Sequence, residues 1–298
     1  MLRHAEWPTI GLLAACYTLW VGAVVGLAET AILPATCLAA LAIAFHSSLT
    51  HEIVHGHPFR DARANAALVF PTLTLVIPLG RFRDLHMAHH RDSDLTDPYD
   101  DPESNYLDPV VWATLPAPVR LVLQVNNTLA GRMVIGPAVS QVAFLAQDWR
   151  RIREGAPEVL NAWLWHIPQA GSVVTFLVVF GSMPWWAYGL AIYGGIALLK
   201  IRTFLEHQAH ERVPGRTVII EDRGWLALLF LNNNFHVVHH MHPAEPWYRL
   251  PGRYLADRAR YLNVNGGYRY ASYADVFRKH LFAAKDPVAH PLYPGKPR

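Results

Sequence analysis

The sequence predicts an all-α membrane protein, with four transmembrane helices in two hairpins, additional re-entrant or interfacial helices, and a cytosolic cap. Three observations support this fold class. The chain of 298 residues is 52% hydrophobic and 16% charged, and soluble domains usually carry more charge than this. Its charge-free runs are close to or longer than the roughly 20 residues that a helix needs to cross a bilayer. Its histidines gather in three short clusters outside these runs.

Two charge-free runs near the N-terminus predict the first hairpin. Residues 10–28 and 31–50 contain no Asp, Glu, Lys or Arg, and we expect the turn between them near residues 29–31. A longer charge-free run, residues 159–199, is long enough for two crossings. Gly181-Ser182-Met183-Pro184 predicts the turn of this second hairpin, because Gly and Pro interrupt helices.

Shorter segments connect the hairpins. Residues 66–80 are uncharged but contain Pro71 and Pro78, and they are too few for a full crossing, so we expect a re-entrant or interfacial segment. We expect residues 132–147 to lie along the membrane surface. Residues 91–108 are acidic and rich in proline, which predicts a loop.

The region after the last cluster is polar and aromatic. From about residue 251 it is expected to form a cytosolic tail, in which residues 272–281 form a short helix with Ser272 as its N-cap. No low-complexity tract divides the chain, and no sequence repeat is present beyond the histidine spacing. We therefore expect residues 1–298 to form a single membrane-bound domain.

The placement of the basic residues predicts the orientation. Neither hairpin turn contains Lys or Arg, so all 26 basic residues lie on the side of the termini and the histidine clusters. Because Lys and Arg are retained on the cytoplasmic side, we expect a multi-pass integral protein with both termini and all clusters in the cytoplasm, in the inner membrane if the source is bacterial. The net charge of +3 and the lack of a phosphate-binding loop predict no nucleic-acid partner.

Eight of the 17 histidines fall into the three clusters, and their spacing is that of metal ligands on helices. Side chains at positions i, i+3 and i+4 share one helix face, and imidazole is the commonest metal ligand in proteins. One zinc site takes three or four ligands, so eight predict two metal ions. The clusters are His51-x-x-x-His55, His86-x-x-His89-His90 and His236-x-x-His239-His240.

The clusters also predict which metal is bound. Each cluster follows an apolar segment at the same expected membrane face, where ligands from separate helices can converge on a shared centre. Neutral imidazole binds iron, copper, zinc or nickel. A lipid chain offers strong C–H bonds, and oxidising them needs a redox metal that binds O2. Two iron ions are therefore the expected cofactors.

The three clusters resemble the histidine boxes of the membrane fatty acid desaturase superfamily. The resemblance spans roughly residues 45–250 and is carried by His51–His57, His86–His90 and Asn234–Pro243, with Thr96-Asp97-Pro98 and Pro246-Trp247-Tyr248 beside them. This superfamily contains acyl desaturases, alkane and fatty acid hydroxylases, and carotenoid ketolases and hydroxylases. The resemblance implies that two irons are bound by His51, His55, His86, His89, His90, His236, His239 and His240.

The superfamily often has a ninth ligand outside the boxes. The resemblance makes His207 the candidate here, and His210 a weaker one, because both follow the fourth predicted helix at the same membrane face. The alternative is that both are polar residues that cap the helix end. Glu206, beside His207, is a candidate for orienting an imidazole.

Three more polar residues near the boxes are candidates for indirect roles. Asn233 and Asn234 would bind a metal through water, or alternatively act as N-caps before the third cluster. Asp97 would orient a ligand imidazole through a hydrogen bond, or alternatively belong to a solvated acidic loop. The same two interpretations apply to the neighbouring residues Asp94, Asp100 and Asp101.

The resemblance favours an O2-dependent oxidoreductase whose substrate, a fatty acyl chain, enters from the bilayer. Desaturation is placed ahead of the alternatives, which are acyl or alkyl hydroxylation and carotenoid ketolation or hydroxylation. Electrons would come from a separate ferredoxin-, rubredoxin- or cytochrome-type protein, because two cysteines within membrane helices cannot hold a four-thiolate cluster.

Two other functions remain open. His51-Glu52-Ile53-Val54-His55 matches the H-E-x-x-H helix of zinc metalloproteases, in which the Glu is the general base. An intramembrane protease would place this helix in or near a membrane segment, but it would leave both H-x-x-H-H clusters without a role. A metal carrier would use the same ligands and would show no O2-dependent turnover.

Overall fold

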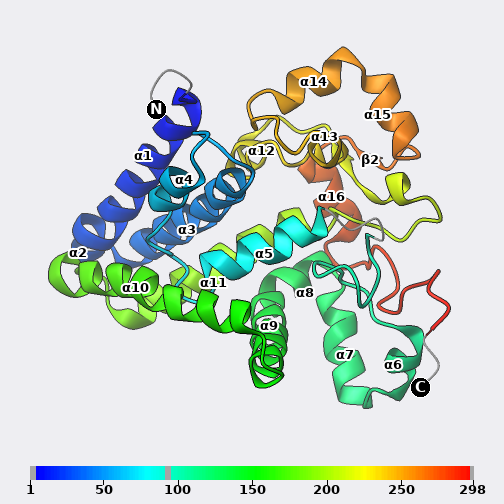
Figure 1. Ribbon diagram of the computed structural model, residues 1–298, viewed down its shortest axis with the longest axis horizontal. Helices are drawn as coiled ribbons and strands as arrows, with labels where there is room; N and C mark the ends of the chain where they lie inside the picture. Colours follow the sequence, from blue (N-terminus) through cyan, green and yellow to red (C-terminus); the bar gives the residue numbers. More distant parts are fainter. Residues whose placement is uncertain (1–4, 91–94, 296–298) are drawn as a thin grey trace. The chain divides into compact units, whose positions relative to one another are not determined.

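The structure is a computed structural model that describes residues 5–90 and 95–295, and its regular structure is almost entirely helical (Figure 1). The strands that the structure describes are only two, of two residues each, and they pair in parallel. The mostly helical structure agrees with the predicted all-α class. The elements are α1 Trp7–Val21, η2 Gly22–Leu27, α2 Ala28–Thr30, α3 Ile32–Val54, α4 Ala62–Leu68, α5 Leu79–His89, α6 Pro109–Thr114, α7 Ala117–Asn126, α8 Leu129–Val134, α9 Gly136–Arg153, α10 Pro157–Phe180, α11 Trp185–Thr203, η3 Val213–Arg216, β1 Ile219–Ile220, α12 Trp225–Leu229, α13 His236–Met241, α14 Leu250–Ala256, α15 Arg258–Val264, β2 Arg269–Tyr270 and α16 Tyr273–His280.

The residues group into two compact units. Unit 1 comprises Met1–Asp84 and Ser140–Leu199, and unit 2 comprises Leu85–Val139 and Lys200–Arg298. Each unit is therefore built from two separate stretches of chain. The single domain expected over residues 1–298 stays a prediction.

Unit 1 contains both predicted hairpins. In the first, α1 continues through the π-helical segment η2 and through α2 to Thr30, and α3 returns from Ile32 to Val54. The turn lies at Ala31, whose φ of −148° leaves the helical region, at the position that the sequence predicts. The helices extend beyond the predicted runs because polar residues such as His51 continue the helix past the charge-free segment.

The second hairpin consists of α10 and α11, which are joined at Gly181–Pro184 as expected. Among the described residues, three helical segments are long and apolar enough to cross a membrane: Trp7–Thr30, Ile32–Val54 and Pro157–Phe180. Helix α11 has 19 residues and carries Lys200 and Arg202 in its last turn, which shortens its charge-free part. A fourth crossing by α11 therefore stays a prediction.

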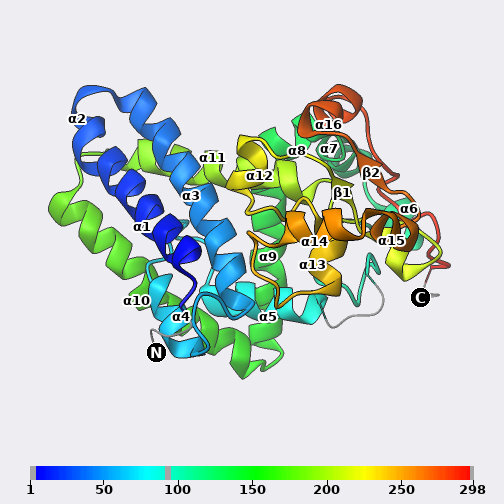
Figure 2. The ribbon, with the colours of Figure 1, turned by 90° about the horizontal axis from the view of Figure 1, so that it is seen from above.

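Small side chains let the helices of unit 1 approach closely. Figures 1 and 2 show α1 running beside α3. A Cβ atom at Gly195 of α11 would lie 2.7 Å from Ile43 Cγ2 and 3.0 Å from Ala40 O of α3. Close packing of this kind is a main source of helix association in lipid, where no hydrophobic drive operates between helices. The small residues of the buried core include Ala35, Ala39, Ala40, Ala42, Ala187 and Ala191.

The segment of residues 66–80 is not a continuous helix, because the chain between α4 and α5 is irregular. Side chains of unit 1 satisfy its carbonyl groups at 2.8–3.0 Å: Tyr188 donates to Leu73 O, His166 to Leu75 O and Gln141 to Val76 O. Irregular backbone at membrane depth requires internal partners of this kind. The geometry agrees with a segment that does not cross the bilayer.

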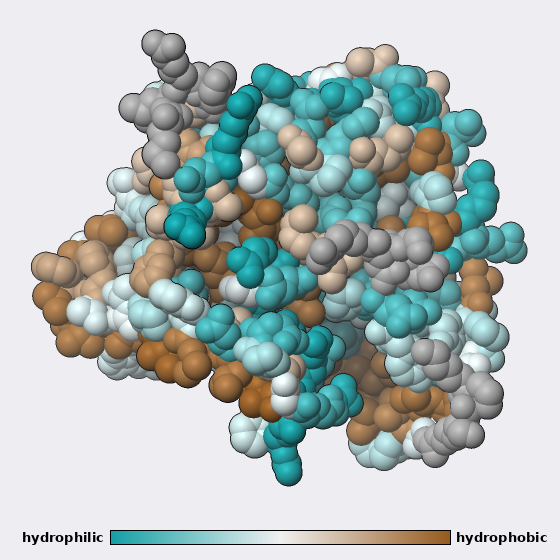
Figure 3. Space-filling view, in the orientation of Figure 1, coloured by the Kyte–Doolittle hydropathy of each residue, from teal (hydrophilic) through white to brown (hydrophobic). Residues whose placement is uncertain are grey.

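The outer surface of unit 1 is hydrophobic. Figure 3 shows hydrophobic side chains gathering over the region of α2 and α10. Exposed apolar surface of this extent marks a contact with a membrane or with another protein. Because α10 is long enough to span a membrane, contact with lipid explains its exposed apolar side chains best. The large exposed side chains of α10 are Leu160, Leu164, Trp165, Ile167, Val174, Val178, Val179 and Phe180.

Unit 2 has its own buried core. The predicted short helix is α16, and the Ser272 hydroxyl caps it by accepting a hydrogen bond from the Asp275 N–H at 3.2 Å, as expected. Arg132 is buried and donates to Asn126 O at 3.0 Å, and the expected position of residues 132–147 along the membrane surface stays a prediction. The core residues are Ile219, Phe235, Val237, Val238, Leu250, Tyr254 and Tyr261.

The contact between α3 and α11 yields a stability prediction. Gly195→Ala places a methyl group against Ile43 and Ala40, so we expect it to destabilise the protein by about 1–3 kcal/mol. Gly189→Ala on the same helix meets no atom within 4 Å and serves as the matched control. Thermal unfolding of both purified variants measures the difference, and equal midpoints would contradict the close approach.

Candidate metal centre

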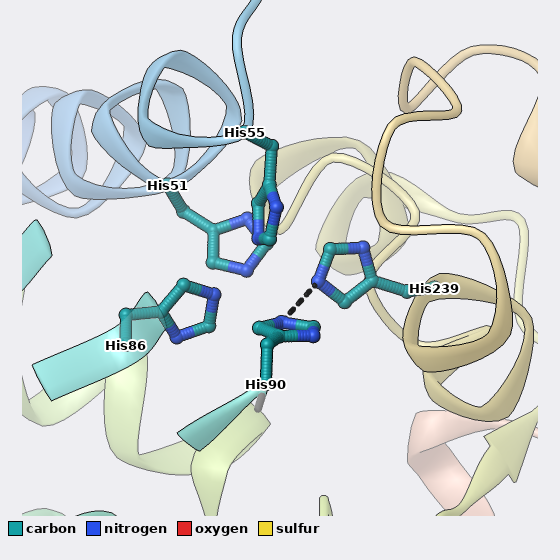
Figure 4. A group of neighbouring side chains, drawn as sticks. All are labelled: His51, His55, His86, His90 and His239. Atoms are coloured by element: carbon teal, nitrogen blue, oxygen red, sulfur yellow. Dashed lines mark hydrogen bonds between the residues drawn. The ribbon is translucent and has the colours of Figure 1, made fainter. Parts of the chain in front are cut away.

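The first histidine cluster lies at the end of α3 in unit 1. His51 is in the last turn of this helix and His55 is its C-cap residue. The two residues are four positions apart, so their side chains project from the same face, and their ring centroids lie 4.9 Å apart (Figure 4). The His51 side chain is buried and that of His55 is half-buried.

The second cluster lies at the end of α5, and its three rings do not all point the same way. His86 and His90 pack with ring centroids 4.6 Å apart (Figure 4). His89, in contrast, packs against His207, at 4.7 Å. Since each helical residue turns the chain by about 100°, positions i and i+4 are only about 40° apart, whereas i+3 and i+4 diverge by about 100°.

The third cluster occupies α13, a six-residue helix, and divides in the same way. His236 and His240, four positions apart, have Nε2 atoms separated by 3.1 Å. His239 points elsewhere, and its Nε2 lies 3.0 Å from that of His90, the contact dashed in Figure 4. Both H-x-x-H-H clusters therefore contribute to two groups of imidazoles.

The first of these groups, called here the four-histidine group, lies entirely within unit 2. It comprises His89, His207, His236 and His240, whose ligand nitrogens all lie within 4.8 Å of one another. The Nε2 atom of His207 is central, at 3.0 Å from that of His89 and 3.1 Å from that of His236. The second, the three-histidine group, comprises His86, His90 and His239, whose ligand nitrogens meet the same criterion.

The backbone of His207 is well anchored. It follows α11 and pairs with Thr217 in an isolated antiparallel bridge. Its carbonyl oxygen accepts a hydrogen bond from the Lys285 ammonium group. His210 is not part of either group, and its Nδ1 accepts a hydrogen bond from the backbone N–H of Arg212 at 3.0 Å. The structure thus brings the stronger candidate for a ninth ligand, and not the weaker one, to the other histidines.

Two carboxylates hold rings of the second cluster from behind. Asp101 Oδ1 lies 2.7 Å from His89 Nδ1, and Glu103 Oε1 lies 2.8 Å from His86 Nδ1. Because a carboxylate accepts, each Nδ1 donates its proton, which leaves Nε2 with a lone pair for a metal. Hydrogen-bonded carboxylates of this kind fix the tautomer and orientation of metal-binding histidines. Asp101 is itself held by the Thr96 N–H at 2.8 Å.

The third cluster has an amide support instead. Asn233 Oδ1 lies 3.3 Å from His236 Nδ1, and Asn233 Nδ2 donates to Glu206 Oε1 at 2.8 Å. Glu206 also pairs with Arg202 at 2.9 Å. Glu206 is therefore linked to His236 through Asn233. It does not bond directly to the neighbouring ring of His207.

Asn234 and Asp97 do not hold a ligand imidazole through a hydrogen bond in the described structure. Asn234 Nδ2 donates to the carbonyls of Ile220 and Asp222, so it fixes that loop. Neither asparagine caps α13, whose N-cap is Phe235 without a side-chain bond, so the N-cap alternative is wrong. Asp97 accepts from the N–H groups of Tyr99 and Asp100, as a turn residue does. Asp94 lies outside the described residues.

The four-histidine group suits a metal ion. A four-coordinate metal with bonds of about 2.0–2.1 Å to nitrogen keeps its ligands roughly 3.3 Å apart, and the observed Nε2 separations are 3.0–3.1 Å. Converging nitrogens repel one another when each carries a lone pair, unless a cation binds among them. The donor set, imidazole throughout, suits iron as well as copper, zinc and nickel.

Comparison with known proteins agrees with these groups. The model of the fatty acid desaturase family matches residues 29–272. The chain belongs to this family. A beta-carotene ketolase from Paracoccus sp. (strain N81106 / MBIC 01143) is 28% identical over 218 residues, which is 71% of this chain and 72% of the ketolase. Family membership, the apolar helices and the histidine groups together show a membrane-bound, metal-binding oxidoreductase.

Burial keeps four of the candidate ligand histidines neutral and ready to bind a metal. It is the main cause that holds the pKa of His207, His236 and His240 well below the usual value, with neighbouring imidazoles adding to the effect. The pKa of His90 falls to about 3, again mainly through burial. Burial also lowers the pKa of His89, but the nearby carboxylates of Glu103 and Asp101 outweigh this effect and raise the pKa to about 9.

Glu103, which contacts His86, is the residue of the candidate site that the sequence does not predict. It follows Pro102 in an irregular loop, where no periodic spacing links it to His86. The sequence favours Asp97 among the four aspartates of this loop, and that choice is wrong, because only the fold of the loop selects Asp101. These assignments depend on tertiary contacts rather than on local spacing.

The position of His207 predicts a selective loss of metal. His207→Ala removes the central nitrogen of the four-histidine group, so purified protein should lose a large share of its bound metal. His210→Ala is the matched control, because His210 lies outside both groups. Elemental analysis of the two variants measures this. Wild-type metal content in His207→Ala would exclude His207 as a ligand.

The two aspartates predict a second contrast. Asp101→Asn weakens the acceptor behind His89 and should lower metal affinity by about 10- to 100-fold. Asp97→Asn keeps an oxygen that can accept from the same N–H groups, and we expect no change. Competition with a metal chelator compares the affinities, and a similar loss in both variants would show that only the loop is disturbed.

Proposed function

We propose that this protein is an O2-dependent di-iron enzyme that oxidises an unactivated C–H bond of a membrane lipid. The observation that carries the proposal is the convergence of imidazole nitrogens in two groups, four in one and three in the other. A single-metal site has no use for so many nitrogens. Two ions held by nitrogen suit the activation of O2 in an apolar setting.

We assign a ligand set to each iron. His89, His207, His236 and His240 would hold one iron, and His86, His90 and His239 would hold the other together with His51 and His55. The assignment of the pair on α3 is supported by its spacing, its burial and the family match, which includes all three clusters. When bound, the iron pair supplies the redox chemistry that activates O2 for attack on a C–H bond.

The residues of the chain provide the setting for that chemistry. Asp101 and Glu103 keep two Nδ1 atoms protonated, so that the opposite nitrogens face the metal side. Burial excludes water from His89 and His236, which are 0% and 2% exposed. Each oxygenation of a C–H bond consumes one O2, two electrons and two protons and releases one water. The electrons would come from a separate ferredoxin-, rubredoxin- or cytochrome-type donor.

The substrate that we favour is a carotenoid. The specific observation is the ketolase relative, which aligns over 72% of its own length and whose name gives beta-carotene as its substrate. Desaturation of a fatty acyl chain is the second candidate, and it is supported by the description of the matching family. Hydroxylation of an acyl or alkyl chain would use the same ligands. Both substrate classes are apolar, and both would reach the protein from the bilayer.

The membrane topology belongs to the same proposal. We propose four crossings, by α1 to α2, α3, α10 and α11, with the termini and histidine clusters in the cytoplasm. The positions of the basic residues support this orientation. The zinc metalloprotease alternative is set aside, because the family model matches from residue 29 to residue 272 and includes both H-x-x-H-H clusters, which a protease would not use.

Lipid profiling distinguishes the two substrates. Expression in cells that make both β-carotene and ordinary acyl lipids, with a compatible electron donor, should produce ketolated or hydroxylated carotenoid only in the presence of O2. The acyl lipids should remain unchanged. A new acyl double bond with unaltered carotenoid would move the assignment to the desaturase reaction.

A matched set of variants links the product to the metal groups. His239→Ala and His89→Ala each remove one ligand from a different group, so product should fall to background in both while the protein still inserts in the membrane. His210→Ala should retain wild-type product. Near-normal turnover in either ligand variant would contradict the two-iron assignment.

A further inference from the structure

Unit 1 contains a third cluster of candidate ligands, and none of its members belongs to the histidine groups. It consists of Glu6 before α1, Glu52 in the last turn of α3, and His57 in the loop that follows. Each of these residues places one ligand atom within 4.8 Å of the other two. Glu52 and His57 are 5% and 6% exposed, so the cluster is not a solvated surface patch.

The imidazole of His57 is held in one orientation. Its Nδ1 lies 2.8 Å from Glu6 Oε1, and because the carboxylate accepts, Nδ1 carries the proton. The backbone adds a second tie between the same segments, since the Glu6 N–H donates to Pro58 O at 3.2 Å. The other nitrogen, Nε2, is thereby placed 4.0 Å from Glu52 Oε1.

The space between His57 Nε2 and Glu52 is too wide for a hydrogen bond. Nε2 is buried and has no hydrogen-bond partner among the described residues, and the same is true of Glu6 Oε2. A neutral His57 would thus direct a lone pair at a carboxylate oxygen, and two acceptors that face each other repel. The 4.0 Å separation is wider than the roughly 3.3 Å between neighbouring ligand atoms of a four-coordinate metal, so a cation that binds between them would draw the two atoms together by roughly 0.7 Å.

We propose that Glu52 and His57 bind a divalent cation, with Glu6 holding the imidazole from behind. Carboxylate, histidine and metal then form the triad that is common in metalloproteins, in which the carboxylate fixes the tautomer. One nitrogen and carboxylate oxygens suit Zn2+, Mn2+ or Fe2+. The ion would join the start of α1 to the end of α3, and it would stabilise the folded unit in proportion to its occupancy. This site does not rest on the proposed function.

The competing arrangement is a doubly protonated His57 between two carboxylates, which needs no metal. The two arrangements differ in one measurable property, the binding of an added cation. His57→Gln removes the nitrogen ligand and keeps a polar side chain. Glu6→Gln keeps both proposed ligands and removes only the charge that holds the ring. His210→Gln, which changes an imidazole outside all three clusters, is the control.

The test is a titration of purified, iron-loaded full-length protein with Mn2+, in which free Mn2+ is followed by electron paramagnetic resonance. We expect wild type and His210→Gln to bind one Mn2+ per chain that Zn2+ displaces. We expect His57→Gln to lose this binding and Glu6→Gln to weaken it by about 10- to 100-fold. Iron content should stay constant in all four proteins, which separates this site from the histidine groups. Equal Mn2+ binding by wild type and His57→Gln, or no binding by wild type, would overturn the proposal.

Discussion

The arrangement of unit 2 depends on bringing imidazole nitrogens together in a buried place. Neutral rings with converging lone pairs repel one another weakly, whereas charged rings would repel one another strongly. Burial, which disfavours the charged form, and the neighbouring rings therefore hold the pKa values of His207, His236 and His240 well below the usual value. These three rings are thereby kept in the neutral form that attracts a cation. The Nε2 atoms lie 3.0–3.1 Å apart, and a cation bound among them would offset the repulsion between their lone pairs.

Much of this centre could be predicted from the spacing of eight histidines, but the division into groups could not. Residues at i, i+3 and i+4 were expected to aim in one direction. In both H-x-x-H-H clusters, i and i+4 act together and i+3 turns to the other group, as with His89 apart from His86 and His90. The angle between i+3 and i+4, about 100°, is the physical reason. One six-residue helix, α13, thereby contributes to two groups.

The fold was predicted best where its cause is local. The charge-free runs and the turns near Ala31 and Gly181 follow from chain composition, and α16 with its Ser272 cap follows from capping chemistry. The hydrogen bonds to the irregular segment between α4 and α5 were not predictable, because Tyr188 and Gln141 reach it from distant parts of the sequence. The same limit applies to Glu103, whose role depends on the path of a loop.

The C-terminal segment contacts the residues that hold the four-histidine group in place. Leu107 donates its N–H to Val288 O at 2.9 Å, and the His290 N–H donates to Leu107 O at 2.8 Å, so the segment lies along the loop that carries Asp101 and Glu103. His290 Nε2 lies 3.1 Å from the Thr96 hydroxyl, and the N–H of Thr96 donates to Asp101. Nearby, Lys285 binds the carbonyl of His207. A tail that the sequence marks as polar and aromatic therefore contacts two segments that lie outside α5 and α13. One is the loop that carries Asp101 behind His89, and the other is the segment of His207.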